Sequence, residues 1–559
     1  MGDIKNILFI MFDQLRFDYL SCAGHPTLST PNIDRLAERS LRFTRAYVQS
    51  PICGSSRMSF YTGRYVHSHG AQRNGFPLKV GEITLGDHLR SRGMDAYLLG
   101  KTHMRADAKG LERLGIAADS IIGVRVSECG FDPIIRDDGL WGEGPDGPSD
   151  PKAAPYNAYL KEKGYPGTNP WNQYANAGVT EVGAIASGWL MENSHLPANV
   201  REEDSETPWL TSQCIAFLEQ KRSEGAGPFM AHLSYIKPHW PYIVPAPYHK
   251  MFSKADVIPA VRTESERSDP HAVYKAYMDT RVSRNFSRDK VRDRVIPAYM
   301  GLIKQCDDQM GRLLDYLEET GQLDSTMIVI TSDHGDYLGD HWLGEKNLFH
   351  ECSVKVPLIV YDPRPEADAT RGQTCDALVE AIDVAATFVD TAAGDFPGHI
   401  IEGRSLAPLL FGENPVEWRD YVISEMDYST TPVARALGVK HKDARIFMVA
   451  DKRWKLVHFE GGFPPMLFDL RSDPDEFTDL GSDPSFAPKV QEMYRHLGDW
   501  ARRLSQRTAI SDTELDEKLN HSVMRKGIFI GVFGKDEVDP ELLRKAGGRA
   551  KGVFGRDGA

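Results

Sequence analysis

A single cysteine lies in the polar segment SPICGSSRMSFYTGRY, which spans residues 50–65. Cys53 precedes Arg57 by one helical turn, and Ser, Thr and Gly are frequent around both. If a helix begins at Cys53, its free backbone N–H groups and Arg57 place positive charge beside the thiol, which favours a thiolate and an anionic substrate. A small buried thiol in a serine-rich turn is the other interpretation, and the segment alone leaves both open.

Two polar pairs follow apolar segments that lie far apart in the sequence. Asp13-Gln14 follows IKNILFIMF, and Asp333-His334 follows STMIVITS. Two carboxylates, an amide oxygen and an imidazole suit a hard or borderline divalent cation. An aspartate after a strand can also cap the next helix, so each pair alone fits either role. The density of Asp and His in SDHGDYLGDH favours the metal site.

Further cationic and hydrogen-bonding side chains follow other apolar segments or lie in loops. They are Lys101, His103, His239, Lys346 and the amide of Asn74. Each alone is commonly a solvated lysine, a structural histidine or a surface amide. Together they predict a positively charged pocket that stabilises a tetrahedral oxyanion, as sulfuryl or phosphoryl transfer requires.

The elements that must position these residues alternate between strands and helices. Strands are predicted over residues 4–12, 93–100, 228–236 and 325–332, and helices over residues 32–40, 84–93, 212–222 and 298–321. This alternation predicts an α/β fold with a large, mostly parallel sheet flanked by helices. Sites in such sheets lie beyond the carboxyl ends of the strands, where the polar residues are found.

Three parts of the chain are predicted from changes in this pattern. Residues 1–420 form the catalytic α/β domain, in which residues 137–208, rich in Gly, Pro, Asn and Trp, make an irregular excursion over the sheet. Residues 421–504 form a smaller C-terminal α+β subdomain with a small antiparallel sheet and a helix. Residues 505–559 form an extended tail, which can pack on its own subunit or act as an oligomerisation arm.

Composition argues against several classes of protein. The 559 residues are 41% hydrophobic and 26% charged, as in folded proteins, and the net charge of −13 does not favour nucleic acid or an anionic membrane. No segment reaches the roughly 20 apolar residues of a membrane span, and the first residues resemble a strand more than a signal peptide, so we expect a cytoplasmic protein. The seven cysteines lack CxxC spacing, which argues against a disulfide framework or a zinc–thiolate site.

In this order, the motifs resemble those of type I (formylglycine-dependent) sulfatases of the alkaline phosphatase superfamily. The similarity is greatest to the bacterial subgroup of phosphonate monoester hydrolases and their arylsulfatase relatives. It runs over roughly residues 4–500, through NILFIMFDQ, PNIDRLAERS, CGSSRMSFYTGRY, GKTH, KPHWPY, TSDHGDYLGDH and LFDLRSDPDEFTDL. The resemblance implies an alkaline phosphatase-like fold, one divalent metal ion and a formylglycine made from Cys53 by formylglycine-generating machinery.

The resemblance also implies roles for the site residues. The implied metal ligands are Asp13, Gln14, residue 53, Asp333 and His334. The implied catalytic residues are Cys53, Arg57, His103, His239 and Lys346, and the implied substrate-binding residues are Asn74, Lys101, His103, His239 and Lys346. In the implied mechanism a hydroxyl of the hydrated aldehyde attacks sulfur or phosphorus, and Arg57 and the metal offset the developing charge. His239 or Lys346 then neutralises the leaving alkoxide, and His103 deprotonates the second hydroxyl.

The sequence departs from the family pattern at informative positions. Ser55 stands where the modification signal usually has Pro or Ala, so conversion of the cysteine can be incomplete or can depend on the host machinery. Gln14 and His334 resemble the phosphonate hydrolase subgroup, and the imidazole favours Mn²⁺ over Ca²⁺ as the metal. Lys101 and His103 resemble the sulfatases instead. We therefore predict an arylsulfatase that also cleaves phosphonate monoesters and phosphodiesters, with the reverse preference as the alternative.

Two other functions stay open from the sequence alone. One is a two-metal phosphatase or mutase that uses His341 and His350 as extra ligands, and the other is a non-catalytic metal protein that binds oxyanions. The leaving group is not identified, although Trp171, Tyr174 or Trp240 would suit an aryl ring if it is not structural. The expected partners are a small sulfate or phosphonate ester and further copies of the chain, as a dimer or tetramer.

Overall fold

The computed structural model describes residues 4–139, 154–392, 394–413, 415 and 418–503, with short stretches between residues 510 and 544. The chain forms two compact units, residues 1–395 with 402–503, and residues 396–401 with 504–559. Most of the predicted tail, residues 505–559, lies outside the described residues, as do residues 140–153 of the predicted excursion. The two larger sheets and the helices that pack on them belong to the first unit.

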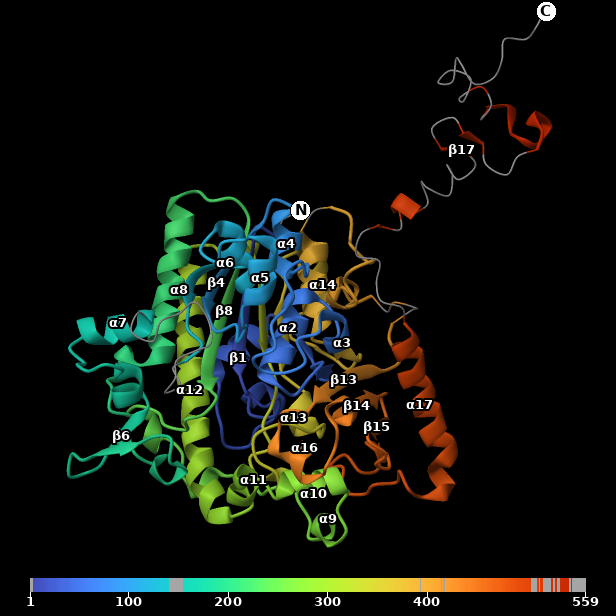
Figure 1. Ribbon diagram of the computed structural model, residues 1–559. Coiled ribbons are helices and arrows are strands. Elements are labelled where there is room, and N and C mark those ends of the chain that lie inside the picture. Colours follow the sequence, from blue (N-terminus) through green and yellow to red (C-terminus); the bar gives the residue numbers. More distant parts are fainter. Residues whose placement is uncertain are drawn as a thin grey trace, which may run out of the picture. The chain divides into compact units, whose positions relative to one another are not determined.

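An eight-stranded sheet forms the centre of this unit (Figure 1). In spatial order its strands are β11 (Thr374–Cys375), β2 (Leu41–Phe43), β10 (Leu358–Tyr361), β9 (Thr326–Ser332), β1 (Asn6–Asp13), β8 (Phe229–Pro238), β4 (Asp95–Gly100) and β5 (Asp132–Arg136). β1 lies between β8 and β9 and is parallel to both, and β4 is parallel to β8, whereas β10 runs antiparallel to β9. The four predicted strands are therefore neighbours, and the mostly parallel α/β sheet is confirmed.

Helices cover both faces of this sheet (Figure 1). They are α8 (Glu206–Ser223) and α12 (Asp289–Glu319) on one face, and α2 (Cys53–Thr62) and α14 (Ile382–Thr391) on the other. Phe9 of β1 packs its ring against Phe60 and Phe388 of the second pair of helices, while the Tyr235 hydroxyl on β8 is hydrogen-bonded to Thr211 of α8. Burial on both faces explains why the central strands read as continuous apolar runs.

The predicted helices are present, with different ends. α1 (Pro31–Ala37) and α4 (Leu85–Arg90) lie close to the predicted ranges, whereas α12 begins well before the predicted start and contains Pro297. Proline removes one backbone donor and disfavours the interior of a helix, and the predicted helix begins directly after it. Val291 and Val295 are nevertheless buried, so apolar packing continues the helix through the proline. In the part of the chain that the structure describes, none of the helices combines the length and apolarity needed to span a bilayer.

A smaller antiparallel sheet follows the large one. Its strands are β13 (Val422–Asp427), β14 (Arg445–Ala450), β15 (Trp454–Phe459) and β16 (Met466–Asp469), and α17 (Ala487–Arg502) packs on it. Ile423 of β13 shares one apolar cluster with Ile382 of α14 and Trp500 of α17. The predicted C-terminal subdomain with its small sheet is therefore confirmed, and its core is continuous with a helix that covers the large sheet.

The described parts of the predicted excursion are residues 137–139 and 154–208, and the second part contains short elements. Among them are α7 (Pro155–Glu162), the turn of π-helix η2 (Trp171–Ala175) and the paired strands β6 (Ala177–Val179) and β7 (Ile185–Ser187). Tyr156 of α7 packs on Trp209 of α8, with 4.9 Å between the ring centroids. This segment therefore lies beside the layer of α8 and α12 (Figure 1).

Candidate active site

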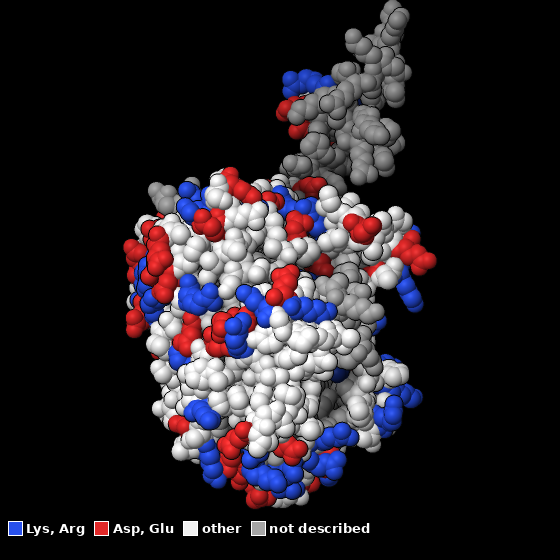
Figure 2. Space-filling view, turned by 90° about the vertical axis from the view of Figure 1, so that its left-hand side faces the viewer, with Lys and Arg blue, Asp and Glu red and all other residues white. Residues whose placement is uncertain are grey.

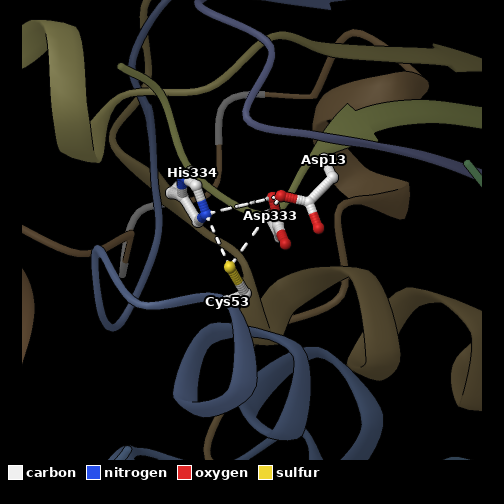
Figure 3. A group of neighbouring side chains, drawn as sticks. All are labelled: Asp13, Cys53, Asp333 and His334. Carbon is white, nitrogen blue, oxygen red and sulfur yellow. Dashed lines mark hydrogen bonds and ion pairs between the residues drawn. The ribbon is translucent and has the colours of Figure 1, made fainter. Parts of the chain in front are cut away.

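The carboxyl ends of the central strands bring the nucleophile candidate and the carboxylates together (Figure 3). Asp13 ends β1, Asp333 and His334 directly follow β9, and Cys53 is the first residue of α2. Their potential ligand atoms lie within 4.8 Å of one another, and all four side chains are buried. Because β1 and β9 are parallel neighbours, residues from the two ends of the α/β region meet at one point.

These four side chains form a donor set that fits a divalent cation. His334 Nε2 lies 3.7 Å from Asp13 Oδ1 and 3.6 Å from Asp333 Oδ1. His334 Nδ1 donates to the carbonyl of Gly335 at 2.8 Å, which leaves Nε2 facing the carboxylates, as in many metal-binding histidines. Two carboxylates and an oriented imidazole would hold a borderline cation such as Mn²⁺, or a harder one with further oxygen ligands.

Gln14 turns its amide oxygen toward the same centre. Its backbone is left-handed, with φ of 67°, and its N–H donates to Asp333 Oδ1 at 3.0 Å. Its side-chain nitrogen donates to the Tyr242 hydroxyl at 3.1 Å and to the Asp336 carboxylate, while Oε1 accepts from Lys346 Nζ at 3.2 Å. Asp336 and Tyr242 thus orient Gln14. The sequence does not predict this role, because nothing in SDHGDYLGDH or KPHWPY pairs these two residues with Gln14.

Replacing Asp336 with asparagine is expected to weaken metal binding about 10- to 100-fold, the usual effect of losing a partner of a metal ligand. The Asp336 carboxylate accepts from Gln14 and Tyr242 through one oxygen and from the Leu338 N–H through the other, and an amide cannot accept at both positions. Titration of metal-free protein with Mn²⁺ measures the Kd. Tyr248→Phe, which removes a buried hydroxyl bonded to Asp308, is the control, and an unchanged Kd in D336N would contradict the orienting role.

Arg57 lies behind the two carboxylates and is fully buried. It donates to Asp333 Oδ2 at 2.7 Å, to Asp13 Oδ2 at 3.2 Å and to the carbonyl of Lys101 at 3.0 Å. Burial works against an ionised Asp13, but Lys101, His239 and Arg57 outweigh burial and hold the pKa of this carboxyl well below its usual range. Arg57 therefore holds both carboxylates in place and helps to keep Asp13 ionised.

Cationic and imidazole groups converge on Cys53. Lys346 Nζ lies 3.0 Å from Cys53 Sγ, 3.1 Å from His334 Nε2 and 3.5 Å from His239 Nε2. Burial raises the pKa of the thiol, but Lys346, His334 and Lys101 outweigh it and bring this pKa well below its ordinary value. The surroundings of residue 53 thus stabilise an anion.

His103 and Asn74 complete the set of predicted residues. His103 has a left-handed backbone, with φ of 57°, its N–H donates to Asp138 Oδ1 at 2.8 Å, and its side chain also helps to lower the pKa of Cys53. Asn74 Oδ1 accepts from the Gly54 N–H at 2.7 Å, in the first turn of α2. The structure therefore brings all the predicted site residues together, and Asn74 holds the end of the helix that carries Cys53. Substrate binding by Asn74 stays a prediction.

The three aromatic candidates for a leaving-group pocket have different surroundings. Trp240 lies beside His239, with 4.6 Å between the ring centroids. Trp171 is buried in the core and donates its indole N–H to Glu206 at 2.7 Å, and Tyr174 lines a surface pocket beside β6 and β7. Of the three, Trp240 is the one in contact with a residue of the candidate active site.

His341 and His350, the extra ligands that a two-metal centre would need, stack on each other. Their ring centroids are 3.6 Å apart with 3° between the planes. His341 Nδ1 pairs with Glu266 at 2.7 Å, and His350 Nδ1 is hydrogen-bonded to the Tyr337 hydroxyl at 3.0 Å. Within the described residues, the one group of acidic, His and Cys side chains with metal-ligand spacing is that of Asp13, so the two-metal alternative gains no support.

The buried His350 is expected to make the protein less stable in mild acid. Burial lowers its pKa well below the usual 6.5, and His341 and Lys455 lower it further. The unfolded chain takes up a proton near pH 6.5 and the folded protein does not. The contribution is therefore fully present above that pH and falls by about 1.4 kcal/mol per pH unit as the pH drops toward the folded pKa.

Urea unfolding between about pH 7.5 and about pH 5.5 measures this loss in the free energy of unfolding. His350→Asn should reduce the slope, whereas His441→Asn, at an exposed histidine, should keep it. Equal slopes in all three proteins would show that His350 does not carry the pH dependence.

Comparisons with known proteins agree with this fold. Residues 5–394 match the family described as Sulfatase, and residues 339–503 match the one described as N-sulphoglucosamine sulphohydrolase, C-terminal. The chain is 30% identical over 535 residues to the multifunctional alkaline phosphatase superfamily protein PehA of Trinickia caryophylli, covering 90% of this chain and 96% of the relative. It is 28% identical over 502 residues to an arylsulfatase of Clostridium perfringens, covering 88% and 93%.

Among solved structures, the phosphonate monoester hydrolase SpPMH from Silicibacter pomeroyi is similar with a TM-score of 0.78 and 28% identity, covering 91% of this chain and 98% of that chain. The buried Asp, Cys and His group lies within the matched Sulfatase region. The chain belongs to the sulfatase family of the alkaline phosphatase superfamily. It is a hydrolase of this family.

Proposed function

We propose that the protein is an arylsulfatase that also cleaves phosphonate monoesters and phosphodiesters. The observation that carries the proposal is the set of cationic groups around residue 53, with Lys346 Nζ at 3.0 Å and Lys101 bonded to Asp13. This arrangement suits an ester with a charged, tetrahedral transferring group. The arylsulfatase and phosphonate monoester hydrolase relatives support both parts of the proposal.

The nucleophile in this proposal is a formylglycine made from Cys53. The Cys53 side chain is 1% exposed in the folded protein, so the machinery that oxidises it must act before the chain has closed around α2. Ser55 lies in the same helix turn, at the middle position of the modification signal, so the converted fraction would depend on the modifying machinery of the host. Activity is therefore expected to scale with the fraction of chains that carry the aldehyde.

A divalent cation, Mn²⁺ or Ca²⁺ with Mn²⁺ favoured by the imidazole, would lower the pKa of a hydroxyl on residue 53 and offset charge on the ester oxygens. Asp13, Gln14, Asp333 and His334 are the residues that would hold it. Arg57 keeps the two carboxylates oriented from behind, through its bonds of 2.7 and 3.2 Å.

The other polar residues would bind the ester and move protons. His239 Nδ1 donates to the carbonyl of Trp240 at 2.8 Å, so Nε2 faces Lys346 and the reacting centre. His239 and Lys346 would neutralise the oxygen of the leaving group, since both reach the same side of residue 53. Lys101 would hold the oxygens of the transferring group, and His103 would accept the proton from residue 53 that allows the product anion to leave.

A phosphonate monoester hydrolase is the second candidate. SpPMH, a protein of that description, is similar to this chain over 91% of the length of this chain. Gln14 and His334 also resemble that subgroup in the sequence. Lys101 and His103 favour the sulfatase, because added cations help to hold the charge that develops on both the sulfuryl group and the leaving oxygen.

The test compares kcat/KM for 4-nitrophenyl sulfate and 4-nitrophenyl phenylphosphonate on the full-length, Mn²⁺-loaded protein, with mass analysis of the peptide that contains residue 53. An aldehyde at residue 53 and a preference for the sulfate would support the proposal. An aldehyde with a preference for the phosphonate would favour the second candidate. An unmodified cysteine in active protein would overturn the proposed nucleophile.

We also propose that the protein is cytoplasmic and assembles as a dimer or tetramer through its C-terminal tail. Light scattering of the full chain and of a chain truncated near residue 505 tests the assembly. An unchanged mass after truncation would rule out the tail as the oligomerisation arm.

A further inference from the structure

A cleft of about 760 Å³ lies next to the candidate active site, where α12 begins. Trp189, Leu190 and Met191 form part of its lining, and α11 (Arg281–Phe286) and the first turns of α12 form another part. Trp189, Leu190 and Met191 fall in the predicted excursion of residues 137–208, and no ligand was predicted for them or for α11. The cleft therefore offers a space for a ligand beyond the residues that surround Cys53.

Two sets of contacts connect this cleft with the reacting centre. Glu345 lines the cleft, and the next residue is Lys346, whose Nζ lies 3.0 Å from Cys53 Sγ. Trp189 also lines the cleft, and its ring lies 5.5 Å from that of Trp240, which itself lies beside His239. Lys346 and His239 are the two residues proposed to neutralise the leaving oxygen. The cleft is thus on the side from which the leaving group departs.

The cleft carries an excess of positive charge. Its charged lining residues are Arg281, Arg288, Lys290, Arg294, Glu192 and Glu345. Over the described residues, none of the four cations forms an ion pair with a carboxylate. Arg294 donates to a backbone carbonyl at 2.8 Å, and the neighbouring carboxylates Asp289 and Asp293 pair with Arg262 and Lys254 instead.

The cations are exposed and can reach a ligand. Arg281, Arg288, Lys290 and Arg294 are all exposed at the surface. Figure 2 shows Lys and Arg side chains, with Asp and Glu among them, at the lower end of the molecule, the level at which α12 begins in Figure 1. Arginine binds carboxylate, sulfate and phosphate groups through two parallel N–H donors, so an anionic group is the ligand that this side of the cleft selects.

We propose that this cleft binds the leaving group of the substrate, and that this group is an aromatic or other apolar alcohol that carries an anionic group of its own. Trp189, Leu190 and Met191 would contact the apolar body, and the arginines would bind the anionic group. The inference rests on the proposed function, because it takes the ester to be cleaved at residue 53.

Two coumarin esters with the same ring and the same ester position test the inference. One is 4-methylumbelliferyl sulfate, and the other is the sulfate ester of 7-hydroxycoumarin-4-acetic acid, which adds a carboxylate. Exposed charge pairs each change affinity by a few-fold, so kcat/KM should favour the carboxylate ester by about 10-fold at about 0.05 M salt. The preference should shrink at about 0.5 M salt, because exposed charges are then screened.

The double variant Arg281→Gln with Arg288→Gln should reduce this ratio of kcat/KM values to about threefold, since it removes two of the four cations. Arg284→Gln is the matched control. This arginine is exposed on the same helix, α11, but does not line the cleft, and its variant should keep the full ratio. A ratio near one in the unchanged protein, or an equal loss in the control, would overturn the inference.

Binding of the two free alcohols separates this inference from the proposed reaction. Fluorescence titration measures the Kd of 7-hydroxycoumarin-4-acetic acid and of 4-methylumbelliferone at a pH below the pKa of the 7-hydroxyl that each carries. This measurement needs no turnover. If 7-hydroxycoumarin-4-acetic acid binds more tightly than 4-methylumbelliferone, and the double variant loses this difference, the cleft binds the anionic alcohol. This result would support the inference even if neither ester were cleaved. In that case only the proposed function would fail. Equal binding of the two alcohols would overturn the cleft assignment even if both esters were cleaved.

Discussion

Replacing Cys53 with alanine is expected to lower kcat/KM for 4-nitrophenyl sulfate by about 10⁴-fold, the order of effect of removing a catalytic nucleophile. The substitution removes the atom from which the aldehyde is made, while Lys346, His334 and Lys101 stay in place. Alanine fits the space of a thiol that is buried at the start of α2. The folded protein and its metal site should therefore persist without turnover.

Cys53→Ser sharpens the test, because it returns one hydroxyl to the same place. Serine has no second hydroxyl on the same carbon to expel the product anion, so steady-state activity should stay low, with at most one turnover per chain. Cys375→Ala, at a half-buried thiol in the edge strand β11, is the control and should keep full activity. Activity of C53A within about tenfold of the unchanged protein would mean that residue 53 is not the nucleophile.

The position of the site could be predicted because its parts follow buried strands. Asp13 and Asp333 each come after an apolar run, and the parallel pairing of β1 with β9 places both ends at one edge. The helix start at Cys53 was predictable from its polar neighbours. In these cases the local pattern and the tertiary structure impose the same arrangement.

The orientation of individual side chains could not be predicted in this way. The spacing of Cys53 and Arg57 indicates one face of a helix, but not that the guanidinium would bond to Asp13 and Asp333 from behind. The contact of Asp336 with Gln14 likewise joins residues from different strand ends. Such contacts depend on three-dimensional packing that a single sequence does not specify.

The limits of the helices depend on packing in the same way. Pro297 argues locally for a helix boundary, yet α12 passes through it, because Val291 and Val295 before it are buried in the core. The start of α12 also forms part of the charged cleft, where Arg288 and Arg294 meet the segment of Trp189. The predicted helix begins after Pro297, so the sequence does not indicate this cleft.

A second group of buried charges connects the small sheet with the loop that carries Lys346. Lys455 of β15 is fully buried, and its Nζ donates to Glu351 at 2.8 Å, to Glu476 at 2.7 Å and to the carbonyl of Phe349 at 3.0 Å. Glu351 begins α13 (Glu351–Val354), shortly after the active-site lysine. The single ammonium group of Lys455 thus donates hydrogen bonds to two carboxylates and a carbonyl that have little access to water.

Replacing Lys455 with methionine is therefore expected to lower the free energy of unfolding by about 3–5 kcal/mol, the cost of leaving buried charges without a partner. Methionine keeps most of the apolar side chain, so the loss is electrostatic rather than a cavity. Lys452→Met is the control, because Lys452 is exposed and forms only a surface ion pair with Asp376 at 3.3 Å, and it should change stability by at most about 0.5 kcal/mol. Urea unfolding at neutral pH measures both variants.

The double variant Lys455→Met with Glu476→Gln decides whether charge causes the loss. Glu476 is the more deeply buried of the two carboxylates, with 2% of its side chain exposed against 18% for Glu351. Removing its charge should recover about 1–2 kcal/mol of the stability lost in K455M, because a neutral amide costs far less to bury than an unpaired carboxylate. A loss in K455M below about 1 kcal/mol, or no recovery in the double variant, would mean that Lys455 acts through packing and not through its charge.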